Sequence, residues 1–352
     1  MNENIGNLVK KLVSTHSLTV DEYEALIKNR DAEVTEALRQ AALEFRHEHY
    51  GRGVFVRGLI EVSSICKNDC LYCGIRCSNG KAQRYRLSKE EIMECCREGY
   101  ALGFRTFVLQ GGEDPYFTDA VLVDLIGAIK AAYPDAALTL SLGERSFESY
   151  KALKAAGADR YLLRHETASP EHYAALHPEK MKHENRLRCL YDLKSLGFQT
   201  GAGFMVGSPY QTERELAYDL KFIEEFKPEM CGVGPFIPHK DTDFRHHAAG
   251  SVDLTCYLLS IIRIIHPTVL LPATTALGTL CEDGRERGIL SGANVVMPNL
   301  SPVSVRSKYS LYDGKIHSGS ESAQSLKELQ ERLNAIGYHI DYKRGDAINE
   351  RK

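Results

Sequence analysis

Between residues 54 and 297, short apolar runs alternate with longer amphipathic stretches in a regular order. This order is typical of repeated β-α units, in which a helix follows each strand and the strands pair in parallel. Eight strands are expected, over residues 54–62, 106–110, 137–142, 160–163, 200–206, 230–233, 269–272 and 294–297. The helices expected between them include residues 89–102, 118–132, 146–156, 213–226 and 254–265.

Eight such units predict an α/β fold of the closed (β/α)8 TIM-type barrel, with its functional site at the C-terminal ends of the strands. A doubly wound open sheet is the alternative. Thr19 and Glu22 have the spacing of a helix capping box, so an N-terminal helical extension is expected before the barrel. The expected division is a helical segment over 1–50, the barrel over 51–300, and an extension with a C-terminal helix over 301–352.

The charge balance excludes several classes of partner. Lys and Arg number 44 against 47 Asp and Glu, a net charge of -3, and no block of like charge stands out. A nucleic-acid-binding or anionic-membrane surface would need a basic patch, so neither is expected. The N-terminus has no apolar core of a secretion signal and no stretch is long enough to span a membrane, so we expect a cytoplasmic protein.

Three cysteines, Cys66, Cys70 and Cys73, directly follow the first expected strand. The cytoplasm keeps thiols reduced, so closely spaced cysteines there favour zinc or an iron–sulfur cluster over disulfides. A structural zinc site usually has four ligands, whereas this loop offers three, with Cys77 as a further candidate in a Gly- and Ser-containing stretch. Three ligands on a four-iron cluster leave one iron open to an exogenous ligand.

Polar residues also follow other expected strands. Gly111, Gly112 and Glu113 end the second strand, where adjacent glycines let a ligand approach the backbone and a carboxylate can receive an ammonium group. Arg164 and Glu166 end the fourth strand. Charged side chains directly beyond an apolar strand need a partner or a ligand. An Arg–Glu ion pair that closes the rim of the barrel is the structural alternative to a ligand-binding role.

The CxxxCxxC spacing, with Tyr72 before the third cysteine, resembles the signature of the radical S-adenosylmethionine (SAM) superfamily. The resemblance implies that SAM chelates the open iron through its methionyl amine and carboxylate. One-electron reduction then cleaves the sulfonium and yields a 5′-deoxyadenosyl radical. The Gly-Gly-Glu segment is similar to the motif that contacts the methionyl amine in this superfamily.

A narrower resemblance rests on the segments NDCLYCGIR, LQGGEDPY, LTLSLGE, DRYLLRHETA, ENRL, GAGFMVG, GPFIPH, LPATTALGT and GANVVMPN, which occur in this order across residues 68–299. Together they resemble the HydE family of FeFe-hydrogenase maturases. The resemblances imply a SAM site formed by Tyr72, Gly111, Gly112, Glu113, Ser141, Glu166, Arg186, Met205 and Ile237. They also imply an inner substrate cavity faced by Thr139, Arg164, Thr274 and Thr275, although each of these threonines can equally be structural.

Membership in that family would imply a role in assembling the diiron subcluster of the hydrogenase H-cluster. The substrate would be a cysteine-bound iron carbonyl cyanide synthon, with a ferredoxin- or flavodoxin-type electron donor and transient contact with the other maturases. Some family members carry a second iron–sulfur cluster near the C-terminus. No cysteine follows Cys281 in this chain, so one 4Fe–4S cluster and no second cluster are expected.

Three alternative functions remain. A biotin-synthase-like sulfur donor would need further cysteine ligands at strand ends, and the third and fifth expected strands have none. A methylornithine-synthase-like mutase shares the barrel and the early helices, but the segments DRYLLRHET and LPATTALG resemble the HydE family more closely. A non-catalytic protein stabilised by a metal is the third alternative, because a fold alone does not establish catalysis.

Overall fold

The computed structural model describes residues 3–316 and 322–348. Residues 1–2, 317–321 and 349–352, which belong to the two expected terminal segments, lie outside the described residues. The chain begins with α1 (Glu3–Thr15), α2 (Val20–Lys28) and α3 (Ala32–Tyr50). The capping box at the start of α2 is confirmed, because the Thr19 hydroxyl accepts the Glu22 N–H and the Glu22 carboxylate accepts the Thr19 N–H.

The strands are short and pair in parallel. The main sheet has the order β2-β3-β4-β5-β6-β8, and β7 pairs with β9. The strands are β1 (Gly53–Val56), β2 (Gly58–Ser63), β3 (Thr106–Gly111), β4 (Ala137–Ser141), β5 (Arg160–Leu162), β6 (Gln199–Ala202), β7 (Met205–Val206), β8 (Met230–Cys231), β9 (Gly234–Pro235), β10 (Val295–Val296) and β11 (His339–Asp341).

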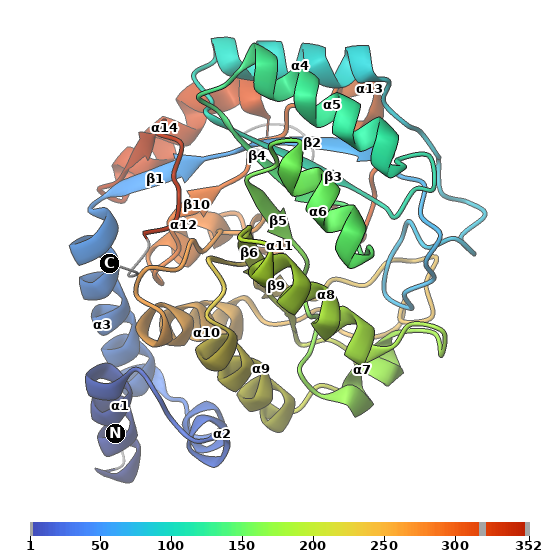
Figure 1. The fold of residues 1–352 in the computed structure, drawn as a ribbon. Coiled ribbons are helices and arrows are strands. Elements are labelled where there is room, and N and C mark those ends of the chain that lie inside the picture. The colour runs from blue at the N-terminus through green and yellow to red at the C-terminus, as the bar shows by residue number, and fades with distance from the viewer. Residues whose placement is uncertain (1–2, 317–321, 349–352) are drawn as a thin grey trace.

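Isolated parallel bridges continue the pairing beyond β8. Met230 of β8 bridges to Leu270, Pro272 bridges to Val295 of β10, and β10 pairs with β1 through Phe55. The parallel pairings therefore lead from β2 through β8 to β10, and β10 pairs with β1, which directly precedes β2 in the chain. We call this arrangement the ring. Figure 1 shows its strands at the centre of the molecule with helices outside them.

Several expected strands differ from the structure: 54–62 is divided into β1 and β2, 230–233 forms only the short β8, and two others differ for local reasons. The stretch 200–206 is divided into β6 and β7 at Gly203, whose φ is 149° and whose place tolerates no side chain, since a Cβ there would lie 2.1 Å from the Gly232 carbonyl oxygen. The stretch 269–272 contributes only the bridges at Leu270 and Pro272. Proline cannot donate a ladder hydrogen bond, which limits regular pairing there.

Five of the outer helices begin at a Ser or Thr residue that caps their first turn. Ser88, Thr118, Ser146, Thr212 and Ser251 each accept a backbone N–H in the first turn of the following helix. The helices are α4 (Lys89–Ala101), α5 (Asp119–Ala132), α6 (Phe147–Ala155), α7 (Pro170–Leu176), α8 (His183–Ser195), α9 (Glu213–Phe226), α10 (Val252–Ile265), α11 (Thr275–Leu280) and α12 (Gly284–Ile289).

The two ends of the chain pack onto the ring. Helix α3 lies along α10, and α2 lies along α9 (Figure 1). After α13 (Val303–Arg306), a short 3-10 turn and α14 (Leu326–Ala335), strand β11 pairs in parallel with β1 on the edge opposite β10. No helix within residues 3–316 and 322–348 is both long and apolar enough to cross a membrane.

Candidate active site

A cavity of about 330 Å³ lies at the C-terminal ends of the strands. Most of the residues expected to bind SAM or substrate lie in its wall, although they come from separate strand ends and loops. The expected residues in the wall are Tyr72, Cys73, Gly111, Ser141, Arg164, Glu166, Arg186, Met205, Ile237, Thr274 and Thr275.

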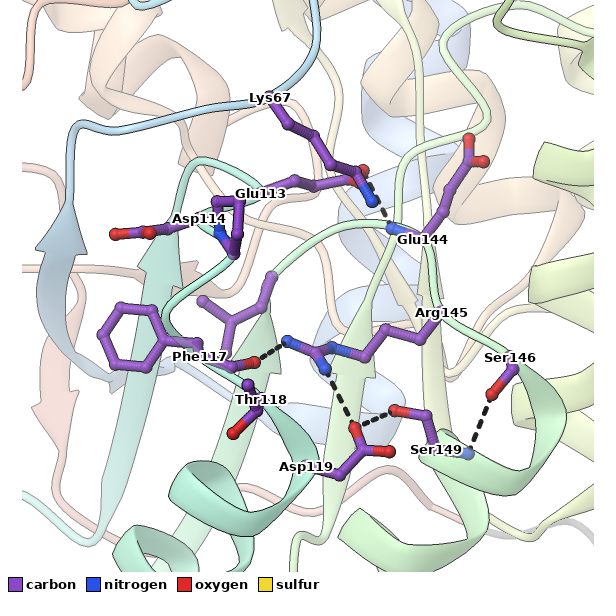
Figure 2. A pocket seen from close by; sticks show the side chains of 12 residues that line it. Lys67, Glu113, Asp114, Phe117, Thr118, Asp119, Glu144, Arg145, Ser146 and Ser149 are labelled. Atoms are coloured by element: carbon purple, nitrogen blue, oxygen red, sulfur yellow. Dashed lines mark hydrogen bonds and ion pairs between the residues drawn. The ribbon is translucent and has the colours of Figure 1, made fainter.

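Other expected residues lie just outside this wall. Gly112 packs against the cysteine loop so closely that a Cβ would lie 2.3 Å from the Ile65 carbonyl oxygen and 2.7 Å from the Cys66 Cβ. The Glu113 carboxylate lies in a neighbouring pocket (Figure 2), where it pairs with Lys67 Nζ at 3.2 Å. The carboxylate therefore lines this neighbouring pocket, next to Gly143 of the main cavity wall.

The cysteine loop connects the end of β2 to the cavity. The Cys66 sulfur accepts the N–H groups of Asn68 and Glu113, both at 3.4 Å, and the Cys70 sulfur lies 3.8 Å from the Met181 sulfur. The Cys73 N–H donates to the Cys70 carbonyl at 3.1 Å, which forms a tight turn. Backbone N–H groups that donate to sulfur are a typical means of stabilising iron–sulfur ligation.

Burial raises the pKa of all three thiols, and that of Cys73 rises to about 12. The charge of Cys66 raises the pKa of Cys70 and Cys73 further, so the three sulfur atoms are within electrostatic range of one another. Buried thiolates that lie near one another need positive charge to stabilise them, and a bound metal cluster provides it. The donor set thus fits an iron–sulfur cluster.

The thiols do not converge on one point. Within the part of the chain that the structure describes, no three His, Cys, Asp or Glu side chains are grouped so that they could hold a metal ion. A polynuclear cluster takes each thiolate on a different iron, so its ligands stand further apart than those of a single ion.

Glu166 has an unusual backbone conformation at the cavity. Its φ is 70°, in the left-handed region that a residue with a side chain seldom adopts, and its N–H donates to the Gly203 carbonyl at 3.0 Å. Its carboxylate accepts a hydrogen bond from Arg164 Nε at 3.1 Å, so the Arg–Glu pair foreseen as the structural alternative is present. Glu166 Oε2 lies 2.8 Å from Arg164 Nη2 but lacks hydrogen-bond geometry.

Two buried hydroxyl groups, one of them in the cavity wall, lack hydrogen-bond partners. Thr139 Oγ1 and Thr274 Oγ1 are both buried, and no atom of the described residues forms a hydrogen bond with either. Buried polar atoms are nearly always satisfied, so the unsatisfied Thr274 oxygen in the cavity wall is available to a ligand or a water. Together with Arg164 and Arg186 it forms a wall suited to a charged, hydrogen-bonding molecule, whereas Thr139 does not line this cavity.

Residues 309–315 form a segment that closes part of the cavity and that was not predicted from the sequence. We call these residues the closing segment. The Gly74 N–H donates to the Leu311 carbonyl at 2.8 Å, and Lys315 Nζ lies 2.6 Å from Glu61 Oε1 of β2. The side chains of this pair are 10% and 0% exposed. The lone charge of Glu61 in an apolar strand was the only signal in the sequence.

Comparisons with known proteins agree with this geometry. Residues 60–223 match the family model of the radical SAM superfamily. The chain is 47% identical over 293 residues to the FeFe-hydrogenase maturase subunit HydE of Thermotoga maritima, covering 83% of each protein. It is 27% identical over 343 residues to the 3-methylornithine synthase of Methanosarcina acetivorans, covering 95% of this chain and 94% of that protein.

Solved structures share the fold. The crystal structure of methylornithine synthase (PylB) superposes with a TM-score of 0.82 at 26% identity, covering 95% of this chain and 97% of that one. The FeFe-hydrogenase maturase HydG superposes with a TM-score of 0.80 at 22% identity, covering 97% of this chain and 77% of that one.

Proposed function

The chain belongs to the HydE family of FeFe-hydrogenase maturases within the radical SAM superfamily, and on this premise we propose how its cavity works. It is a radical SAM enzyme of hydrogenase maturation. The observation that carries the proposal is the cysteine loop beside a cavity whose wall contains Ser141, Glu166 and Arg186. The family implies a 4Fe–4S cluster and SAM.

Cys66, Cys70 and Cys73 hold the cluster in this proposal. When bound, the reduced cluster and SAM supply reductive cleavage of the sulfonium to a 5′-deoxyadenosyl radical. The N–H groups that donate to the Cys66 sulfur stabilise charge on the cluster. With no cysteine after Cys281, we propose that this is the only cluster in the chain.

The cavity residues bind and orient SAM. The Arg186 guanidinium suits the methionyl carboxylate, and the Ser141 hydroxyl and Glu166 carboxylate suit the ribose hydroxyls or the amine. Tyr72, Met205 and Ile237 contribute apolar surface for the adenosyl group. In this arrangement Gly111 and Gly112 allow close approach of the backbone, while the Glu113 carboxylate acts from the neighbouring pocket.

The substrate occupies the inner part of the cavity, next to Arg164. Thr274, whose hydroxyl is unsatisfied, and Thr275 line the cavity, and in this proposal they and the buried, unsatisfied hydroxyl of Thr139 receive an anionic ligand. We infer that this ligand is a cysteine-bound iron carbonyl cyanide synthon and that the product serves diiron subcluster assembly. The closing segment excludes water while the reaction proceeds.

The wider architecture follows the same proposal. We infer that the ring is an eight-stranded (β/α)8 barrel, flanked by a helical segment over 1–50 and an extension over 301–352. The enzyme works in the cytoplasm, receives electrons from a ferredoxin- or flavodoxin-type donor, and meets the other maturases transiently.

Anaerobic reconstitution with SAM and dithionite tests the activity. We expect about four irons per chain, formation of 5′-deoxyadenosine, and loss of both in Cys70→Ser. Cys77→Ser is the matched control, because Cys77 is an exposed cysteine of the same loop. Absence of 5′-deoxyadenosine from the wild type, or its persistence in Cys70→Ser, would refute the proposal.

The maturation role has its own test. Apo-hydrogenase is incubated with the other maturases, and hydrogen evolution is measured with this protein present or omitted. We expect activity only when it is present. The similarity to 3-methylornithine synthase favours a second candidate activity, and detection of 3-methylornithine by mass spectrometry, without any effect on maturation, would establish that activity instead.

A further inference from the structure

Glu144 lies just behind the wall of the main cavity. It follows Gly143 in the turn after β4 and lines the neighbouring pocket of about 310 Å³, together with Lys67 and Glu113. Figure 2 shows the Glu144 carboxylate extending away from the Lys67–Glu113 pair. Glu144 is not part of the main cavity wall, whereas Gly143 beside it is.

The Glu144 carboxylate binds the guanidinium that we assign to SAM. Glu144 Oε1 accepts the Arg186 Nε hydrogen at 2.6 Å, and the two side chains are 16% and 8% exposed. Arg186 Nη1 donates to the Arg164 carbonyl at 3.1 Å, and Asn185 donates to the other Glu144 oxygen. Held at two points, the planar guanidinium has a fixed direction towards the cavity.

The backbone of Glu144 contacts Glu113, which lies on the side of the cysteine loop. Its N–H donates to Glu113 Oε1 at 2.9 Å, and Lys67 holds Glu113 Oε2 (Figure 2). Gly143 makes this contact possible, because its φ is 79° and a Cβ there would lie 2.0 Å from Glu113 Cγ. The Glu113 N–H in turn donates to the Cys66 sulfur. Glu113 and Glu144 together therefore connect the cysteine loop to Arg186.

We propose that Glu144 is a positioning residue for SAM: it holds the Arg186 guanidinium at the distance from the cluster loop that the methionyl carboxylate requires. This inference rests on the proposed function. A mostly buried, charge-assisted hydrogen bond is worth considerably more than an exposed ion pair, so its loss is measurable in SAM affinity. Glu144 does not touch SAM itself.

The test measures SAM binding to the reconstituted, reduced protein. SAM is titrated while the electron paramagnetic resonance signal of the cluster is recorded, and KM and kcat are measured in parallel. Glu144→Ala is expected to weaken SAM binding by roughly 10- to 100-fold. Its KM should rise more than its kcat falls, and the signal without SAM should remain that of the wild type. Glu144→Gln, which keeps an acceptor, is expected to give an intermediate value.

Glu148→Gln is the matched control, because Glu148 lies four residues further along and its side chain is 77% exposed. It should bind SAM like the wild type. Wild-type affinity in Glu144→Ala would overturn the inference, and so would tighter binding, which would show that Glu144 competes with SAM for Arg186. Failure of the wild type itself to bind SAM would instead refute the proposed function.

Discussion

The ion pair between Glu61 and Lys315 should hold the closing segment over the cavity. Replacing Glu61 with Gln keeps the shape of the side chain and its contact with Asn299, but removes the negative charge that lies against the Lys315 ammonium. The two side chains are 0% and 10% exposed, so the ammonium cannot be solvated unless the segment moves. We therefore expect the segment to open more often in Glu61→Gln.

The magnitude follows from the burial of the pair. Removing one partner of a buried ion pair costs about 3–5 kcal/mol, because the other charge stays buried without the charge that faced it. If that cost falls on the local opening of the closing segment, its opening constant rises roughly 100- to 4,000-fold. Lys315→Met leaves the Glu61 carboxylate uncompensated and should have a similar effect. The double variant removes both charges and should recover much of the loss.

Hydrogen exchange measured by mass spectrometry reports this opening directly. The Asp313 N–H donates to the Pro238 carbonyl at 3.1 Å, so a peptide over residues 309–316 contains a protected amide. Its exchange should accelerate in Glu61→Gln, while a peptide over β3 and β4 should exchange at the wild-type rate. Equal exchange of the closing segment in both proteins, or equal acceleration everywhere, would refute the reasoning.

Two further predictions concern stability. Gly143→Ala should lower the free energy of unfolding by about 1–3 kcal/mol, which is more than Gly197→Ala should. Both glycines have positive φ, but of the two only Gly143 faces a neighbour, the Glu113 carboxylate. Equal losses of stability in urea denaturation would contradict the clash at Gly143. Burial, with Arg263, Lys194 and Lys227 nearby, lowers the pKa of His266 to about 4. As the pH falls, this histidine is therefore protonated in the unfolded chain before it is protonated in the folded one. The free energy of unfolding should decrease as the pH drops from about 6.5 towards 4. His266→Asn should lose less stability than the wild type over this range in denaturation at several pH values, and an unchanged slope would disprove this assignment.

Local sequence signals were sufficient for the strand ends and the cysteine loop. Cys66, Cys70 and Cys73 lie next to a strand with a clear apolar pattern, and a polar residue at a strand end has only one edge of a parallel sheet to occupy. Helix starts were equally local, as the Thr19 cap shows. Such features depend on residues within a few positions of one another.

Contacts between distant residues could not be read in this way. Lys315 meets Glu61 across 254 positions, and no periodicity connects them. The orientation of Glu113 depends on Lys67 and on the space left by Gly143, so its motif alone did not predict the ion pair with Lys67 or the neighbouring pocket that its carboxylate lines. Strand β11, over His339–Asp341, is too short to show an alternating pattern.

The position of β1 between β10 and β11 also has a consequence for synthesis on the ribosome. Phe55 pairs with Val295 on one side and with Asp341 on the other, so β1 can complete its pairing only after β10 and β11 have been synthesised. Chains grow at about 5–20 residues per second, and contacts between such distant positions form slowly. The nascent N-terminal half therefore exposes an unpaired strand edge until translation ends, and this is the interval in which chaperones would matter most to this enzyme.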